Sequence, residues 1–148
     1  MLEKELKILD IDIAHIEHTL TAHGAICTYK GPIYDIIFNK RSKKQKLKVR
    51  LRKRTDGARL CFKQKSKAYL ESDIKVRQEW EYPVNWWETF QTLQQETHLE
   101  PIETRFKHRT VYKIGDVGFD IESYPSLPPF LEIEAPTAEL IHEWMRIL

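Results

Sequence analysis

The sequence predicts an α+β fold with about eight β-strands and three amphipathic helices. Charged and apolar residues alternate along most of the expected strands, so each strand has an ionic face and an apolar face. The segments with helical spacing can cover the apolar faces, which leaves the ionic faces on the opposite side of the sheet. A sheet of this size can close into a barrel and turn its charges inward, whereas an open sheet would leave them in bulk water. The spacing alone is compatible with both arrangements.

The length of the chain, 148 residues with a mass of 17.7 kDa, is enough for one domain with a sizeable core. The formal net charge is only +2 although 31% of the residues are charged, and basic residues dominate the segment 40–54. Cys27 and Cys61 lie far apart in a sequence that shows no signal peptide and no apolar run near the roughly 20 residues of a membrane span. We therefore expect a cytoplasmic protein with no membrane partner.

The first strand is expected at residues 3–8. Its ionic face carries Glu3, Glu5 and Lys7. Apolar residues then recur at helical spacing over 13–20, which predicts a helix. Asp10 or Asp12 can cap its N-terminus, and Gly24 suits its C-terminal end.

Two basic strands are expected in the middle of the chain. They follow an aromatic and β-branched strand at 34–38 and a polar connection at 39–45. The first basic strand covers 47–54, and a hairpin turn at Asp56 and Gly57 leads into the second. The cations that share one face of these strands are Lys48, Arg50, Arg52, Arg54, Lys63 and Lys65. Like charges on facing strands repel, so this face requires water, counter-charges or an anionic ligand.

The next strand, expected at 76–82 after a polar connection at 66–72, carries both signs of charge on one face. These charged residues are Arg77, Glu79 and Glu81. Pro83 should end the strand, and Asn85 can cap a helix that ends near His98. The apolar side chains of this helix are expected to pack on the sheet: Trp86, Trp87, Phe90 and Leu93.

The last third of the chain returns to alternating strands, expected at 105–112, 117–122 and 131–134. Gly115 begins a turn between the first two, and Thr137 can cap a closing helix. The charged residues on these strands are Arg105, Lys107, Arg109, Asp120, Glu122, Glu132 and Glu134.

This ordered series of charges resembles the CYTH superfamily, the triphosphate tunnel metalloenzymes that include class IV adenylyl cyclases and thiamine triphosphatases. Glu3, Glu5 and Lys7 match the family's ExExK signature. The residues that follow in the family's order are Arg50, Arg52, Lys63, Arg77, Glu79, Glu81, Lys107, Arg109 and the segment 130–134. The resemblance covers nearly the whole chain. It implies an eight-stranded antiparallel β-barrel, or tunnel, that binds a triphosphate and a divalent metal in its charged lumen.

Two departures from the family's pattern stand out. Relatives place an Asp on the strand before the last, and here Asp120 and Glu122 compete for that role, with the spacing to Glu132 favouring Glu122. Relatives also commonly continue past the last helix, whereas this chain stops at Leu148. We therefore expect a single domain over 1–148 without that C-terminal extension, with a more open tunnel or a shifted choice of substrate.

The same residues can be assigned from their chemistry. Guanidinium and ammonium groups suit the negative charges of a triphosphate. The predicted phosphate-binding residues are Lys7, Arg50, Arg52, Lys63, Lys65, Arg77, Lys107 and Arg109. Carboxylates are hard ligands that suit Mg²⁺ or Mn²⁺. The predicted metal ligands are Glu3, Glu5, Asp120, Glu122, Glu132 and Glu134. The predicted catalytic residues are Lys7, Arg52, Glu79 and Glu81.

The reaction that we favour is metal-dependent hydrolysis of the terminal phosphate of a triphosphate, because it requires only a triphosphate and water. Inorganic triphosphate, ATP and thiamine triphosphate are the candidate substrates. The first alternative is a class IV adenylyl cyclase that makes cyclic AMP and pyrophosphate from ATP. The second is a non-catalytic module that binds polyphosphate or RNA through the basic segment, although nucleic acid is the less favoured partner because carboxylates share the same faces. The third alternative is a tunnel that folds but has lost activity.

An exposed sheet edge or the helix with Trp86 could support a homodimer.

Overall fold

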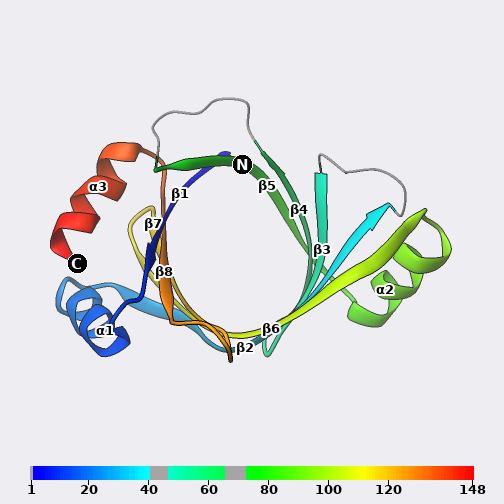
Figure 1. The fold of residues 1–148 in the computed structure, drawn as a ribbon, viewed down its shortest axis with the longest axis horizontal. Helices are drawn as coiled ribbons and strands as arrows, with labels where there is room; N and C mark the ends of the chain where they lie inside the picture. The colour runs from blue at the N-terminus through cyan, green and yellow to red at the C-terminus, as the bar shows by residue number, and fades with distance from the viewer. Residues whose placement is uncertain (1, 41–46, 66–72) are drawn as a thin grey trace. The chain divides into compact units, whose positions relative to one another are not determined.

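The computed structural model describes residues 2–40, 47–65 and 73–148, which form eight strands and three helices (Figure 1). The elements are β1 (Leu2–Leu9), α1 (Ile13–Ala22), β2 (Ile26–Lys40), β3 (Leu47–Arg54), β4 (Gly57–Lys65), β5 (Lys75–Val84), α2 (Trp86–Gln95), β6 (Leu99–Ile114), β7 (Val117–Ser123), β8 (Phe130–Ala135) and α3 (Ala138–Ile147). The strands close into an antiparallel barrel in the order β1-β5-β4-β3-β2-β6-β7-β8. This confirms the predicted α+β barrel with three flanking helices.

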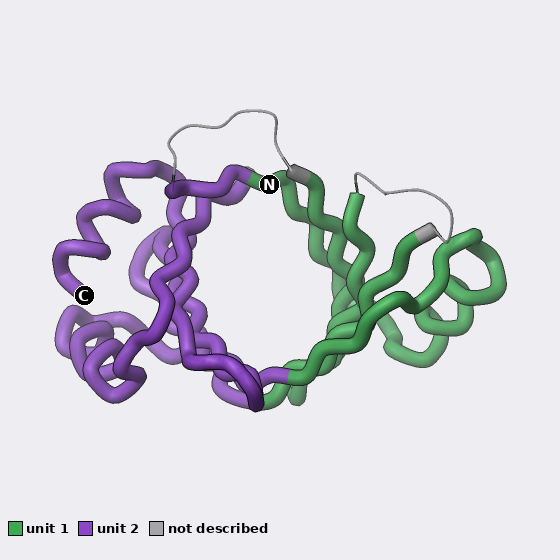
Figure 2. The backbone as a smooth tube through the Cα atoms, in the orientation of Figure 1, with its two compact units in different colours: residues 1, 32–66, 77–106 green, residues 2–31, 67–76, 107–148 purple. Residues whose placement is uncertain are grey.

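Two compact units make up the chain (Figure 2). Unit 1 contains residues 32–66 and 77–106, and unit 2 contains residues 2–31, 67–76 and 107–148. Each unit has its own apolar core and its own set of charged side chains, so we describe each one by itself.

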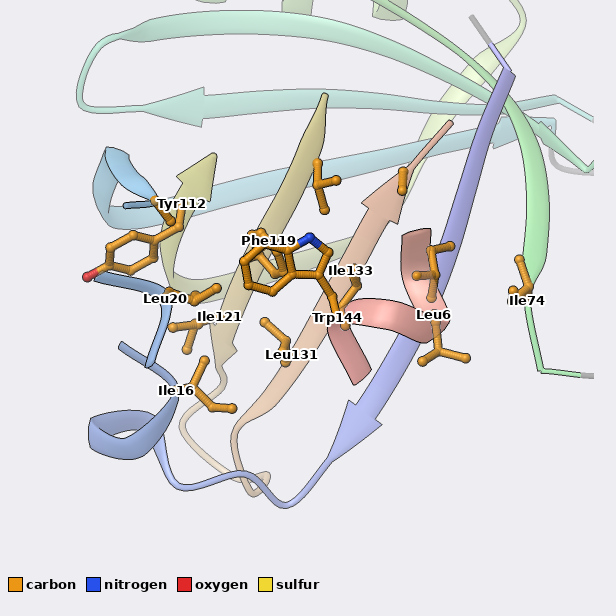
Figure 3. Packing of buried hydrophobic residues seen from close by; sticks show 14 of the residues in the cluster. Leu6, Ile16, Leu20, Ile74, Tyr112, Phe119, Ile121, Leu131, Ile133 and Trp144 are labelled. Carbon is orange, nitrogen blue, oxygen red and sulfur yellow. The ribbon is translucent and has the colours of Figure 1, made fainter. Parts of the chain in front are cut away.

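The core of unit 2 lies between its helices and its sheet. Figure 3 shows the indole ring of Trp144 from α3 over the strands, where it meets the ring of Phe119 edge-on at a centroid distance of 4.8 Å. Leu20 from α1 and Leu131 and Ile133 from β8 are fully buried in the same cluster. Burying one such side chain stabilises the fold by about 1.5–3 kcal/mol. The helices therefore cover the apolar faces of β7 and β8, and the charged residues lie on the opposite faces.

The core of unit 1 lies under α2. Phe38, Val49 and Leu51 from β2 and β3 are buried with Leu93 of the helix. Trp87 is the exception to the expected packing of this helix, because its side chain is 62% exposed. Its ring stacks on that of Phe90, three residues later, at a centroid distance of 6.0 Å, so Trp87 lies at the edge of the stripe that faces the sheet.

The three helices begin where the sequence indicates. Asp12, rather than Asp10, caps α1, because its Oδ1 accepts a hydrogen bond from the amide of His15 at 3.1 Å. Asn85 and Thr137 cap α2 and α3 in the same way. None of the helices in the described part of the chain is long and apolar enough to span a membrane.

Several strands are longer than expected. β2 begins at Ile26 and runs through Pro32, and β5 continues through Pro83 to Val84. Proline fixes φ at a value that extended backbone accepts, so neither residue has to end a strand. α2 ends at Gln95 and not near His98. Of the two polar connections expected at 39–45 and 66–72, residues 41–45 and 66–72 lie outside the described residues.

Candidate functional site

Three carboxylates gather on the charged face of unit 2. The register of β7 and β8 places Asp120 opposite Glu132, and Glu122 follows two residues later on the same face of β7. Asp120, Glu122 and Glu132 each offer an oxygen, and these oxygens lie within 4.8 Å of one another. The side chain of Glu122 has no exposed surface. The alternation along two neighbouring strands is therefore sufficient to assemble an acidic cluster.

Three cations neutralise this cluster. The Nζ of Lys107 lies 3.0 Å from Oε1 of Glu122, and Arg109 forms ion pairs with both Glu122 and Asp120. On the neighbouring strand β1, Lys7 is in register with Glu132, and its Nζ lies 3.1 Å from Oε1 of that carboxylate. Each of the three carboxylates is thus paired with at least one of the predicted phosphate-binding cations.

These pairs set the charge state of the cluster. Burial by itself would raise the pKa of Glu132, but the charges of Lys7 and Arg109 outweigh it and lower the pKa below its usual value. Burial by itself would lower the pKa of Arg109, but the charges of Asp120 and Glu122 outweigh burial and raise the pKa above its usual value. Both groups are therefore fully ionised at neutral pH, as a metal ligand and a phosphate-binding cation should be.

The donor set fits a hard divalent cation. Oε2 of Glu122 is buried and has no hydrogen-bond partner among the described residues. Such an atom is unusual, because buried polar atoms normally have a partner or a bound ion or water. Oxygen donors at this spacing suit Mg²⁺ or Mn²⁺. Both Asp120 and Glu122, the two competing candidates from the sequence, belong to this cluster.

The other predicted metal ligands lie beside the cluster and not in it. Glu5 on β1 is in register with Glu134 on β8, and Glu5 is buried. Glu134 is also opposite Gly118 on β7, a residue without a side chain. Glu3 lies two residues before Glu5 on the same face of β1. They extend the acidic face along the strands away from Glu132.

Two aromatic rings contact the lysines of this site. The Nζ of Lys7 lies 4.3 Å from the ring centroid of Phe130, and that of Lys107 lies 5.5 Å from the ring centroid of Tyr124. The two rings stack with an interplanar angle of 17°. Each ammonium group is therefore held by a carboxylate and by the face of a ring. Tyr124 was not among the predicted site residues, because a tyrosine next to a proline-rich loop carries no distinctive pattern.

A second charged set lies on the charged face of unit 1. Its most buried members are Arg52 and Asp35, which form a two-pronged ion pair with nitrogen–oxygen distances of 2.8 and 2.9 Å. Asp35 was not among the predicted site residues. The sequence offered one signal, a single acidic residue within the apolar strand 34–38. The structure places this residue opposite Arg52 in register.

Glu79 bridges two further cations of unit 1, Lys63 and Arg50. One oxygen of Glu79 lies 2.8 Å from the Nζ of Lys63, and the other lies 3.5 Å from a terminal nitrogen of Arg50. Glu81 is instead paired with Arg59 at 3.1 Å and is substantially exposed. The two predicted catalytic glutamates therefore have different surroundings.

Two further predicted residues occur at the ends of these strands. Arg77 is half-buried on β5, at the register position opposite Lys65 on β4. The side chain of Lys65 lies outside the described part of the structure.

Cys61 on β4 lies between Arg50 and Glu81 in register and is almost fully buried. Burial raises the pKa of its thiol, although the charge of Arg50 opposes this shift.

Comparison with protein families identifies the chain. The model of the CYTH domain matches residues 1–143. The chain belongs to the CYTH domain family. No curated protein matches the sequence significantly.

Solved structures share the CYTH fold of this chain at low sequence identity. The PH1012 protein of Pyrococcus horikoshii OT3 is 20% identical, with a TM-score of 0.77 over 98% of this chain and 88% of its own. A candidate adenylate cyclase from Vibrio parahaemolyticus is 14% identical, with a TM-score of 0.76 over 99% of this chain and 84% of its own. A Hippeastrum protein, described as a candidate adenylyl cyclase with a dominant triphosphatase activity, is 12% identical, with a TM-score of 0.68 over 97% of this chain and 84% of its own. At these identities the likeness establishes the fold.

Within this CYTH domain, the predicted site residues fall into two groups by unit. The group in unit 2 comprises Glu3, Glu5, Lys7, Lys107, Arg109, Asp120, Glu122, Glu132 and Glu134. The group in unit 1 comprises Arg50, Arg52, Lys63, Lys65, Arg77, Glu79 and Glu81. Unit 2 thus contains the close carboxylate cluster, and unit 1 contains most of the predicted phosphate-binding cations.

Proposed function

We propose that this protein is a divalent-metal-dependent hydrolase that removes the terminal phosphate of inorganic or organic triphosphates. The observation that carries the proposal is the interleaving of acids and cations in unit 2, where Asp120, Glu122 and Glu132 alternate in contact with Lys7, Lys107 and Arg109. A metal site alone would not need three cations on its ligands, and an anion site alone would be weakened by the carboxylates. A metal–phosphate complex needs both.

The proposed roles follow from the contacts. Asp120, Glu122 and Glu132 would hold Mg²⁺ or Mn²⁺, with Glu3, Glu5 and Glu134 as further acidic groups along the same face. When bound, the metal would polarise a phosphoryl oxygen and offset the charge that develops during transfer. The ammonium and guanidinium groups that now neutralise the carboxylates would bind phosphate oxygens once the carboxylates serve as ligands. In unit 1, Arg50, Arg52, Lys63, Lys65 and Arg77 are proposed as further phosphate-binding groups.

The nucleophile distinguishes two outcomes at such a site. Water at the terminal phosphorus gives hydrolysis, and Glu79 and Glu81 of unit 1 remain the predicted catalytic carboxylates, with Glu81 the more exposed of the two. The ribose hydroxyl of ATP at the α-phosphorus would give cyclic AMP and pyrophosphate. The second candidate function is kept because structural neighbours are described as candidate adenylyl cyclases, one of them with a dominant triphosphatase activity.

The test is an assay of phosphate, pyrophosphate and cyclic AMP release from inorganic triphosphate, ATP and thiamine triphosphate, with Mg²⁺, with Mn²⁺ or with chelator. We expect metal-dependent release of phosphate from at least one substrate. Glu132→Gln should lower turnover by about 100-fold, by analogy with the loss of one preorganised electrostatic group. Glu143→Gln, an exposed change on α3, is the matched control and should leave turnover unchanged.

Three results would contradict the proposal. Cyclic AMP with pyrophosphate would assign the protein as a cyclase. Tight triphosphate binding without turnover would assign it as a binding module. Full activity of Glu132→Gln would mean that the acidic cluster does not hold the catalytic metal.

A further inference from the structure

Two aromatic rings connect the lysines of the site in unit 2. Tyr124 directly follows the last residue of β7, and Phe130 is the first residue of β8. Their rings stack at a centroid distance of 6.1 Å. The ring centroid of Phe130 also lies 4.3 Å from the Nζ of Lys7. The ring centroid of Tyr124 lies 5.5 Å from the Nζ of Lys107. The four side chains therefore form one continuous series of contacts from β1 to β6.

The loop between the two rings holds them in place. The amide of Leu127 donates a hydrogen bond to the carbonyl oxygen of Tyr124 at 3.5 Å. The carbonyl oxygen of Pro129 accepts one from the amide of Ile11 at 3.2 Å. Proline also restricts the backbone φ at three positions of this loop, which are Pro125, Pro128 and Pro129. A constrained segment thus presents the stacked rings, so little conformational entropy is lost in holding them together.

A ring holds an ammonium group differently from a carboxylate. In this structure Glu132 neutralises Lys7 at 3.1 Å, as part of the acidic cluster. In the same way Glu122 neutralises Lys107 at 3.0 Å. A ring attracts an ammonium group through its quadrupole and carries no net charge, so the ammonium group keeps its full charge for a phosphate. If the carboxylates serve as metal ligands, the lysines lose these charged partners and the ring contacts remain.

We propose that Tyr124 is a positioning residue of the triphosphate site and acts through its stack on Phe130. The ring pair keeps the ammonium groups of Lys7 and Lys107 at the site when the carboxylates are engaged as metal ligands. Removal of either ring releases both lysines, because each ring fixes the plane of the other. The inference rests on the proposed function, since it assumes that these two lysines bind the phosphates.

The test measures, by calorimetry in Mg²⁺, the binding of a non-hydrolysable triphosphate analogue with methylene groups in place of the bridging oxygens. We expect Tyr124→Leu and Phe130→Leu each to raise the dissociation constant about fivefold. The double variant should also raise it about fivefold, whereas two independent contacts would multiply to about 25-fold. Tyr124→Phe keeps the ring, so its dissociation constant should stay within about twofold of that of the unmodified protein.

Two controls separate this role from a general loss of packing. Tyr82→Leu removes a half-exposed tyrosine from unit 1, and this variant should bind the analogue as the unmodified protein does. Titration with Mg²⁺ alone should give the same dissociation constant for Tyr124→Leu and for the unmodified protein, because the proposed metal ligands remain in place.

Several results would overturn the proposal. They are normal binding of the analogue by Tyr124→Leu, a double variant that shows the product of the single effects, and equally weak binding by Tyr124→Phe and Tyr124→Leu. An equal loss in Tyr82→Leu, an equal loss of Mg²⁺ affinity, or no binding of the analogue by the unmodified protein would also overturn it. Because no turnover is required, normal binding of the analogue without hydrolysis of any triphosphate would contradict the proposed function alone.

Discussion

At the scale of the residue, the pair of Asp35 and Arg52 is the contact whose loss the fold should tolerate least. Both side chains are almost completely buried, so Arg52→Ala would remove the two-pronged partner of a carboxylate in the interior. The contact of Arg50 with Asp35 is longer, at 3.9 Å. We expect the free energy of unfolding, measured by urea denaturation, to fall by about 3 kcal/mol.

The matched control for this prediction is Arg54→Ala on the same strand. Arg54 is paired with Asp56, which is exposed, and exposed pairs contribute at most about 1 kcal/mol. Equal losses of stability in the two variants would show that burial does not set the energy of these pairs.

The two cysteines should differ in reactivity. Cys61 is almost fully buried and burial raises the pKa of its thiol, so little thiolate forms at pH 8, and what forms is inaccessible. Cys27 is exposed. Mass spectrometry after iodoacetamide treatment at pH 8 should show modification of Cys27 alone, and both residues should react in denaturant. Rapid native labelling of Cys61 would mean that β4 opens readily.

At the scale of the element, the rings at the edge of β7 and β8 position the lysines of the proposed site. Phe130→Leu removes the ring that lies against Lys7 and keeps an apolar side chain. If Lys7 binds phosphate, freeing its ammonium should raise KM for the triphosphate by about fivefold, with a smaller effect on kcat. Steady-state kinetics would measure this change.

Phe130→Tyr is the conservative variant for the same position, because it retains an aromatic face for the ammonium. The KM of this variant should stay close to that of the unmodified protein. A KM that rises equally in both variants would point to lost packing around β8 and not to the contact with Lys7.

The charge alternation made most strands predictable from the sequence. Over residues 47–52 of β3, charged side chains alternate with aliphatic ones, and the carboxylates of β7 and β8 likewise alternate with apolar side chains, so the period and the two faces could be predicted from the sequence pattern alone. The caps of α2 and α3 were equally clear, since Asn85 and Thr137 each precede an apolar helical run.

The features that could not be predicted depend on tertiary context. Pro83 remains inside β5, opposite Arg59, because its backbone suits the extended conformation at that position. Asp35 becomes a buried partner only because β2 and β3 pair in the register that faces it with Arg52. Asp12 and not Asp10 caps α1. Asp10 has a φ of 55°, a backbone conformation that the local sequence does not specify.

At the scale of the whole molecule, chemistry and stability are coupled through the carboxylates. Asp120, Glu122 and Glu132 are held together by β7 and β8, and the apolar sides of these strands form the core under Trp144. Placing like charges this close costs free energy, which Lys107 and Arg109 offset in the described structure. The strands therefore hold a charge arrangement that the unfolded chain cannot reproduce.

A ligand that binds only this folded arrangement must stabilise the protein. If the cluster holds Mg²⁺ or Mn²⁺, saturating metal at about 100 times its dissociation constant should raise the free energy of unfolding by about 2.7 kcal/mol, seen as a concentration-dependent rise in Tm. Glu122→Gln should abolish most of this rise, because it removes the buried carboxylate whose Oε2 is without a hydrogen-bond partner among the described residues. Glu143→Gln should keep it. An equal rise of Tm in Glu122→Gln would place the metal elsewhere, and this result would be independent of whether any triphosphate is hydrolysed.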